Sequence, residues 1–252
     1  MSILEDIVKN KQKELDGLPT LLTSEVSKSS VSFTDAITRA RVGIIAEIKK
    51  KSPSAGDLAC DQDLVAKAKG YELAGADAIS VVTDQKYFGG SLELFIDIRN
   101  ATSLPMLMKD FIIHPYQVMQ AEKARADALL IIAALHKYFH PDLLSTLQKS
   151  SIIPVMEVAT IEELSLPFVQ QADVIGVNAR DLNTFKVDIH RACSLMHKIS
   201  KEKTVIAFSG INDRSDVEQY QSAGAQAVLV GESLMKSKNI KVTINSLRNN
   251  IS

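Results

Sequence analysis

The sequence has very few cysteines. Cys60 and Cys193 are the two among 252 residues, and they lie too far apart for a zinc-type ligand spacing. Disulfide-dense secreted folds carry many more cysteines than this, so a disulfide framework is excluded. The composition favours a reducing compartment.

The sequence also lacks an excess of charge of either sign. Its 29 Lys and Arg residues nearly balance its 30 Asp and Glu residues, which gives a formal net charge of −1. Binding to nucleic acid or to an anionic membrane draws on a basic excess. The composition therefore gives no reason to expect either partner.

Long apolar runs are absent as well. The longest, residues 128–135, falls far short of the about 20 residues that a membrane-spanning helix requires. Acidic residues near the N-terminus stand where a secretory signal would carry positive charge, and no apolar segment of signal type follows. We therefore expect a soluble cytoplasmic protein.

Short apolar runs rich in β-branched residues alternate with longer stretches of helical periodicity. Eight such runs are expected to be buried strands: residues 43–48, 78–83, 106–108, 128–133, 153–158, 174–178, 205–209 and 227–230. Helix-start signals such as Asp61-Gln-Asp-Leu-Val stand between them. With no linker dividing the chain, this predicts one domain over residues 1–252, an α/β fold of the (β/α)8 TIM barrel type. A doubly wound open sheet is the alternative.

Residues 1–40 exceed what eight strand–helix units need. Apolar residues in this segment recur at helical spacing: Ile3, Leu4, Ile7, Val8 and Leu15. They predict an N-terminal helical extension that packs on the barrel before the first strand. Such a helix either covers the barrel wall or helps to close one mouth.

Polar residues stand at the carboxyl ends of most predicted strands, where barrel enzymes assemble their active sites. They are Glu47, Lys49, Lys109, Glu157, Asn178 and Ser209. Any one of them could be a solvated strand end. Together, two lysines, two carboxylates and an amide at one mouth predict a catalytic site, because a low dielectric shifts pKa values and permits proton transfer near neutral pH.

Glycines follow the last two predicted strands, at Gly210 and Gly231, each before a predicted helix. Backbone N–H groups at a helix start bind phosphate, and in barrels a phosphate site commonly follows these two strands. Plain turn glycines are the alternative. His136 and His140 lie four residues apart but without a His-Glu-x-x-His pattern, so we expect no metal site there.

In these segments the sequence resembles the indole-3-glycerol-phosphate synthase family. The resemblance covers nearly the whole chain and rests on ordered motifs. They are Ile45-Ala-Glu47-Ile-Lys49 with Ser52-Pro53-Ser54, Val82-Thr83-Asp84 with Tyr87-Phe88-Gly89-Gly90-Ser91, Lys109-Asp110-Phe111, Glu157-Val158, Ile175-Gly176-Val177-Asn178 with Arg180-Asp181-Leu182, Ser209-Gly210-Ile211 and Val230-Gly231-Glu232-Ser233.

The resemblance implies conversion of 1-(2-carboxyphenylamino)-1-deoxyribulose 5-phosphate to indole-3-glycerol phosphate, a step of tryptophan biosynthesis that releases carbon dioxide and water and needs no metal or organic cofactor. It implies that Lys109 is the general acid and that Lys49 lies near the phosphate and hydroxyls of the substrate. Glu47 and Glu157 would carry protons or orient the lysines, with the division between them left open.

The resemblance also implies residues for the rest of the substrate. Asn178 and Ser209 would position it, and Ser52, Gly210, Gly231 and Glu232 would cradle the phosphate, the last by its backbone N–H. Arg180 would lie near the carboxylate that leaves, and Phe111, Leu130 and Ile132 would form an apolar wall for the anthranilate ring. The resemblance leaves open whether the chain associates with other enzymes of the pathway.

Several positions depart from the family pattern. Phe208 stands where a glutamate is usual, and Ala159 where a histidine often follows Glu-Val. Alternation counted from Ala207 turns Ser209 to the mouth and Phe208 to the surrounding helices, but a bulged strand end would bring Phe208 into the mouth, which we favour. Two other functions stay open: a phosphosugar barrel such as phosphoribosyl-anthranilate isomerase, and a barrel that has lost activity and serves as a binding partner.

Overall fold

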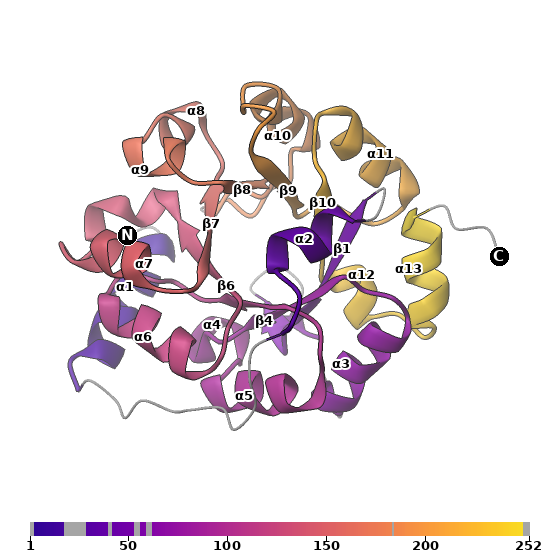
Figure 1. The fold of residues 1–252 in the computed structure, drawn as a ribbon, viewed down its shortest axis with the longest axis horizontal. Coiled ribbons are helices and arrows are strands. Elements are labelled where there is room, and N and C mark those ends of the chain that lie inside the picture. Colours follow the sequence, from indigo (N-terminus) through magenta and orange to yellow (C-terminus); the bar gives the residue numbers. More distant parts are fainter. Residues whose placement is uncertain are drawn as a thin grey trace.

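A computed structural model describes residues 3–17, 29–39, 42–52, 56–58, 62–182 and 184–248. Its centre is a closed barrel of parallel strands in the spatial order β1-β10-β9-β8-β7-β6-β5-β4, ringed by helices (Figure 1). The strands are β1 (Gly43–Ile48), β4 (Ala78–Val82), β5 (Met106–Lys109), β6 (Ala128–Ile132), β7 (Ile153–Val158), β8 (Val174–Asn178), β9 (Thr204–Phe208) and β10 (Ala227–Val230). The predicted TIM barrel is confirmed, and the open sheet is wrong.

The predicted strands lie within one residue of the observed ones. β1, β7, β8 and β10 match at both ends, whereas β9 begins and ends one residue earlier than expected. Its end is set by Ser209, whose φ of 68° is left-handed and breaks the extended backbone.

The barrel has two apolar layers because side chains alternate along each strand. Ile45, Leu107 and Val155 point into the barrel interior, whereas Ile44 and Val158 pack against the helices. Two residues beyond each of the three inward side chains, toward the carboxyl end of the strand, stand Glu47, Lys109 and Glu157. The inward face of each strand therefore changes from apolar to charged at one mouth.

Helices connect the strands on the outside. The longer ones are α3 (Leu64–Leu73), α5 (Leu92–Ala101), α6 (Pro115–Lys123), α7 (Leu143–Lys149), α10 (Ile189–Met196), α11 (Arg214–Ser222) and α13 (Ile240–Arg248). Short elements are β2 (Lys51–Ser52), β3 (Gly56–Asp57), α4 (Gln85–Phe88), the 3-10 turn η1 (Ala133–Tyr138), α8 (Ile161–Leu164), α9 (Pro167–Gln170) and α12 (Glu232–Met235). The side chains of Asp63, Thr160 and Asp213 cap α3, α8 and α11.

Two N-terminal helices cover opposite ends of the barrel. α2 (Phe33–Thr38) lies across the barrel centre in Figure 1 and buries Phe33 and Ile37 there. It covers the amino ends of the strands, since a Cβ on Gly43 would collide with the carbonyl of Ile37. α1 (Ile3–Leu15) instead packs Ile7 and Val8 in the interior cluster beside residues that follow β5 and β6. The predicted extra helix is present, and it lies at the mouth.

A buried lysine fixes α1 at this mouth. Lys11 Nζ lies 2.7 Å from an oxygen of Asp110, 3.2 Å from Asp84 and 2.9 Å from Glu14. Burial alone would lower the pKa of Lys11, but Asp110 and Asp84 outweigh it and the pKa is raised. Asp84 and Asp110 follow β4 and β5, so the ion pairs join α1 to two loops of the mouth.

The cysteines and the apolar runs were also singled out in the sequence. Cys60 lies outside the described residues, and Cys193 on α10 is a free thiol. In the part of the chain that the structure describes, no helix combines the length and apolarity needed to cross a membrane.

Candidate active site

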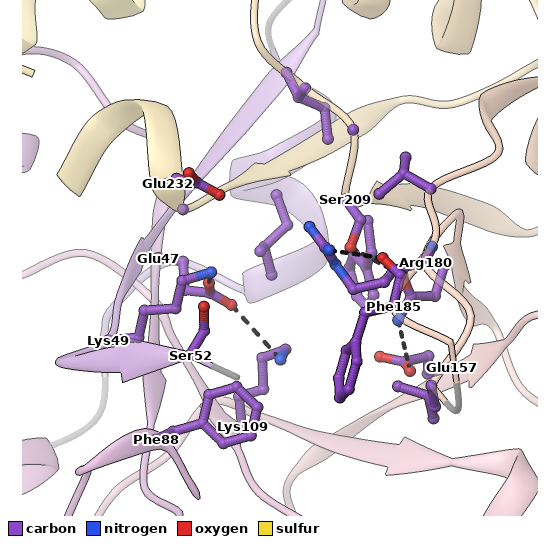
Figure 2. Close-up of a pocket in the computed structure, with 18 of the residues that line it drawn as sticks. Glu47, Lys49, Ser52, Phe88, Lys109, Glu157, Arg180, Phe185, Ser209 and Glu232 are labelled. Atoms are coloured by element: carbon purple, nitrogen blue, oxygen red, sulfur yellow. Dashed lines mark hydrogen bonds and ion pairs between the residues drawn. The ribbon is translucent and has the colours of Figure 1, made fainter. Parts of the chain in front are cut away.

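A cavity of about 240 Å³ opens at the carboxyl ends of the strands (Figure 2). All the residues predicted to carry chemistry line it: Glu47, Lys49, Lys109, Glu157, Asn178 and Ser209. The polar residues and glycines implied by the resemblance line it too: Ser52, Arg180, Gly210, Gly231 and Glu232. The barrel therefore brings both sets together at one mouth.

Glu47 holds both lysines on one side of the cavity. One carboxylate oxygen lies 2.7 Å from Lys49 Nζ and the other lies 3.6 Å from Lys109 Nζ. Burial pushes the pKa of Glu47 upward, but the two ammonium groups outweigh burial and the pKa is lowered. Glu47 is therefore an anion at neutral pH.

Glu157 belongs to a different set of contacts. Asn178 Nδ2 donates to Glu157 Oε1 at 3.0 Å, and Ser209 Oγ donates to Asn178 Oδ1 at 3.0 Å. Burial raises the pKa of Glu157, and the opposing effects of Lys109 and of the Asn178 hydrogen bond do not cancel it. Among the described residues no cation lies within ion-pair distance of Glu157. The protonated form of this carboxyl is therefore favoured more than it is in a solvated glutamate.

Figure 2 shows the two sets on opposite sides of the cavity. Glu47, Lys49 and Ser52 lie on one side, and Glu157 and Arg180 on the other. Lys109 lies between them in this view, with its ammonium 5.9 Å from the ring centre of Phe88. A substrate in this cavity would contact an ammonium group and a protonatable carboxyl at once.

The end of β9 turns two successive side chains to the cavity. Phe208 packs in the barrel interior with Ile206, and Ser209 also lines the cavity because its left-handed φ breaks the alternation. The prediction that Phe208 faces the helices is wrong, because it was counted from Ala207, which packs in the outer layer. The favoured prediction, that Phe208 lies at the mouth, is confirmed.

Phe208 fits against a residue without a side chain. A Cβ on Gly176 would lie 2.6 Å from the ring of Phe208, so the neighbouring strand can carry only glycine while the ring stays in place. The ring is buried, and it stands at the sequence position where the family pattern has a glutamate. Among the described residues that line the cavity, the buried carboxylates are Glu47 and Glu157, and Phe208 adds an apolar group to the same lining.

Gly231 leaves room for the ion pair. A Cβ there would lie 2.9 Å from Lys49 Nζ and closer still to the carboxylate of Glu47. Gly210 has a φ of 75°, which favours glycine. Both glycines line the cavity with Ser52 and Lys49, the other residues expected near the phosphate.

The predicted apolar wall is placed differently. Phe111 and Leu130 are buried in the interior cluster and do not line the cavity, and Ile132 lines a smaller cavity beside it. The apolar lining is instead Phe88, Leu182, Phe185, Val187, Phe208, Ile211 and Leu229. Three of these come from the loop after β8, where Arg180 Nη1 donates to the carbonyl of Phe185 at 3.0 Å. Strand periodicity carries no signal for side chains in such a loop.

The two histidines four residues apart do not act as a pair. His136 Nδ1 lies 3.0 Å from the carbonyl of Ala133, and the ring of His140 packs edge-on against His114 with centroids 4.6 Å apart. η1 ends before His140, so the two residues do not share a helix face.

Comparison with known proteins gives one consistent family. The sequence model of the indole-3-glycerol phosphate synthase family matches residues 4–247 of this chain. The chain is 39% identical to the indole-3-glycerol phosphate synthase of Aquifex aeolicus over 247 residues, 95% of this chain and 96% of that one. It is 44% identical to the Leifsonia xyli protein of the same name over 81% of this chain and 79% of that one, and 37% identical to the Bacillus cereus protein over 99% of each.

Proposed function

Because the chain belongs to the indole-3-glycerol phosphate synthase family, we propose that its barrel mouth closes the indole ring of indole-3-glycerol phosphate. The substrate is 1-(2-carboxyphenylamino)-1-deoxyribulose 5-phosphate, and carbon dioxide and water leave. The observation that carries the proposal is the pairing of a lysine ammonium, Lys109, with two buried carboxylates of opposite pKa shift in one cavity.

Lys109 is the general acid of this proposal. Ring closure needs a proton on the ketone oxygen as the aryl carbon attacks, and an ammonium group at the mouth can supply it. Glu47 lies 3.6 Å from Lys109 Nζ, so an ion pair holds the ammonium group at the cavity. The acid is thereby positioned before the substrate arrives.

Glu157 handles the second proton. Its raised pKa favours the protonated carboxyl, and the dehydration step requires a group that takes up and releases a proton. Asn178 and Ser209 hold it in place through their hydrogen bonds and also contact the cavity. Glu47, whose pKa is lowered, is the poorer proton carrier and orients the two lysines.

The remaining lining residues bind the substrate. Lys49 and Ser52, with the backbone N–H groups after Gly210 and Gly231, take the phosphate. Arg180 faces the carboxylate that leaves. The anthranilate ring packs on the apolar lining, in which Phe208 and Leu229 form a floor. The few cysteines fit a cytoplasmic location, which is part of the proposal.

One assay tests the function. Purified protein is mixed with the carboxyphenylamino-deoxyribulose phosphate in metal-free buffer, and indole absorbance is followed. We expect turnover by the wild type and none by Lys109→Ala. A wild type without turnover would contradict the proposal and favour a barrel that serves as a binding partner. The same preparation with phosphoribosyl anthranilate tests the isomerase alternative, which would use a Cys/Asp pair in place of the lysines.

A further inference from the structure

A second, smaller cavity of about 120 Å³ adjoins the first. The two share Glu157 and Leu182 in their linings. The other lining residues of the smaller cavity are Leu4, Ile132, Ala134, Ala159, Thr160, Glu163, Asp181 and Arg191. A water molecule takes about 30 Å³ in the liquid, and cavities with several polar partners hold ordered water. This cavity is therefore large and polar enough for a short chain of waters beside Glu157.

Glu163 places a second carboxyl on this cavity. It accepts a hydrogen bond from the backbone N–H of Ala159 at 2.6 Å and stands at the start of α8. The Glu157 residue is 4% exposed, whereas Glu163 is half-buried and reaches toward solvent. The cavity thus leads from a buried carboxyl to a partly exposed one.

Charged groups from several elements face the two carboxyls. Glu157 faces Lys109 from β5, Glu47 from β1 and Glu163 from α8. Glu163 faces Arg191 from α10 and the neighbouring Glu162, with Asp181 also on the cavity. Burial raises the pKa of both carboxyls, and for each of them the opposing contacts do not cancel it. Each therefore binds a proton more readily than a solvated glutamate does.

The proposed reaction requires a proton from solvent. Its substrate carries an ionised carboxylate that leaves as neutral carbon dioxide. The balanced reaction is therefore substrate plus one proton giving indole-3-glycerol phosphate, carbon dioxide and water. Substrate in the main cavity would cover Lys109 and the open side of Glu157. Glu157 also lines the smaller cavity, so water there would still contact its carboxyl.

We propose that the smaller cavity is the path by which this proton enters, with Glu163 as the relay between solvent and Glu157. The inference rests on the proposed function. In each turnover the Glu163 carboxyl gives its proton to a water of the cavity, that water gives a proton to the Glu157 carboxylate, and solvent returns a proton to Glu163. Proton transfers along hydrogen bonds make up every step, and the sum is the one proton that the reaction consumes.

Ala159 leaves space for this path. Its small side chain lines the cavity at the position where the family pattern often has a histidine. Arg191 donates to the carbonyls of Ala159, Asn178 and Ala179 at 2.7 to 2.9 Å, so the backbone around the cavity is fixed. A larger side chain at position 159 would take up the space that the waters need.

The test compares Glu163→Gln with Glu162→Gln. Glutamine keeps an oxygen for the Ala159 N–H but cannot carry a proton, and Glu162 is an exposed neighbour of the same charge. We expect Glu163→Gln to lower kcat about 5- to 20-fold, a modest part of what acid–base groups contribute, with the loss growing toward high pH and KM within about twofold. Imidazole buffer should restore part of kcat. Ala159→Val should slow turnover in the same pH-dependent way.

Two results would overturn the relay. One is a kcat profile of Glu163→Gln that coincides with that of Glu162→Gln. The other is read without turnover, by carbon-13 titration of the Glu157 carboxyl in both variants. Loss of the Glu163 charge should lower the pKa of Glu157. An unchanged pKa would mean that the two carboxyls do not interact, which would contradict the relay. A wild type without synthase activity would overturn the proposed function, and with it the need for the proton.

Discussion

Glu47 and Glu157 enter the mouth from opposite sides of the barrel and meet opposite surroundings. β1 and β7 are four places apart in the closed ring of strands, and the two residues are 3% and 4% exposed. Yet the pKa of Glu47 is lowered and that of Glu157 is raised. Equal burial therefore does not decide the protonation of a carboxyl here. The partners decide it: two ammonium groups form ion pairs with Glu47, whereas Glu157 has the amide of Asn178 and the more distant charge of Lys109.

The difference divides the chemistry between the two sides. Glu47 stays ionised and holds Lys49 and Lys109, whereas Glu157 has a raised pKa and binds a proton more readily. Lys109 interacts electrostatically with both carboxyls. Pairs of titratable groups with diverging pKa values mark acid and base roles in a site.

Removing the shared lysine should have the largest effect. We expect Lys109→Ala to lower kcat by about 10³-fold or more while substrate binding stays within a few-fold, because a proton donor acts mainly in the transition state. Steady-state kinetics measure this, with Lys50→Ala on the exposed neighbour as control. Retention of more than about a tenth of the wild-type kcat would remove Lys109 as the essential acid.

Glu157→Gln should come next. Glutamine keeps the size and one oxygen for Asn178 but accepts no proton, so kcat should fall by about 10²-fold with little change in KM. The same kinetics measure it. A nearly silent substitution would show that the role of Glu157 is structural.

Glu47→Gln and Glu157→Gln should change the pH dependence of the free energy of unfolding in opposite directions. The depressed pKa of Glu47 adds stability above its unfolded pKa of about 4.3, which is lost as the pH falls through the lower folded value. The raised pKa of Glu157 works in reverse, so its ionisation costs stability as the pH rises above about 4.3.

Urea unfolding of the wild type and both variants between about pH 2.5 and pH 8 measures the effect, because the change at Glu47 falls below about pH 4.3 and the change at Glu157 above it. Relative to the wild type, Glu47→Gln should become less stable as the pH rises and Glu157→Gln more stable, by about 1.4 kcal/mol for each unit of pKa difference. Parallel curves for the two variants would contradict the opposite shifts.

Gly231→Ala should have the smallest effect. The new Cβ would press on Lys49 and Glu47 without removing either, so we expect KM to rise about three- to tenfold and kcat to change less. Gly17→Ala is the control, because nothing lies within 4 Å of a Cβ there. An unchanged KM would mean that the ion pair can shift without loss of substrate contacts.

Much of this arrangement could be predicted from the sequence. Strand ends and inward polar residues follow from period-two alternation, which is why Glu47, Lys109 and Glu157 were found. Alternation failed at Phe208, because counting from Ala207 assumed the wrong inward face. Phe185 was missed because its place depends on a loop held by tertiary hydrogen bonds, which have no sequence period.

The opposite pKa shifts of Glu47 and Glu157 could not be predicted from the sequence either. Glu47 and Lys49 lie two residues apart in one motif, but nothing in the motifs says which carboxyl contacts Lys109. That choice follows from the ring order of the strands, which brings β1 near β5 through β4 and places β7 beside β8. The contacts of Lys11 with Asp84 and Asp110 depend likewise on where α1 packs.

The most direct test is a carbon-13 titration of protein labelled at the glutamate carboxyls. Glu47→Gln and Glu157→Gln assign the two resonances, and both are followed in the free wild type from about pH 3 to pH 9. The account predicts that Glu157 titrates above the ordinary glutamate value of about 4.3 and Glu47 below it. Two coincident titrations, or the reverse order, would contradict it.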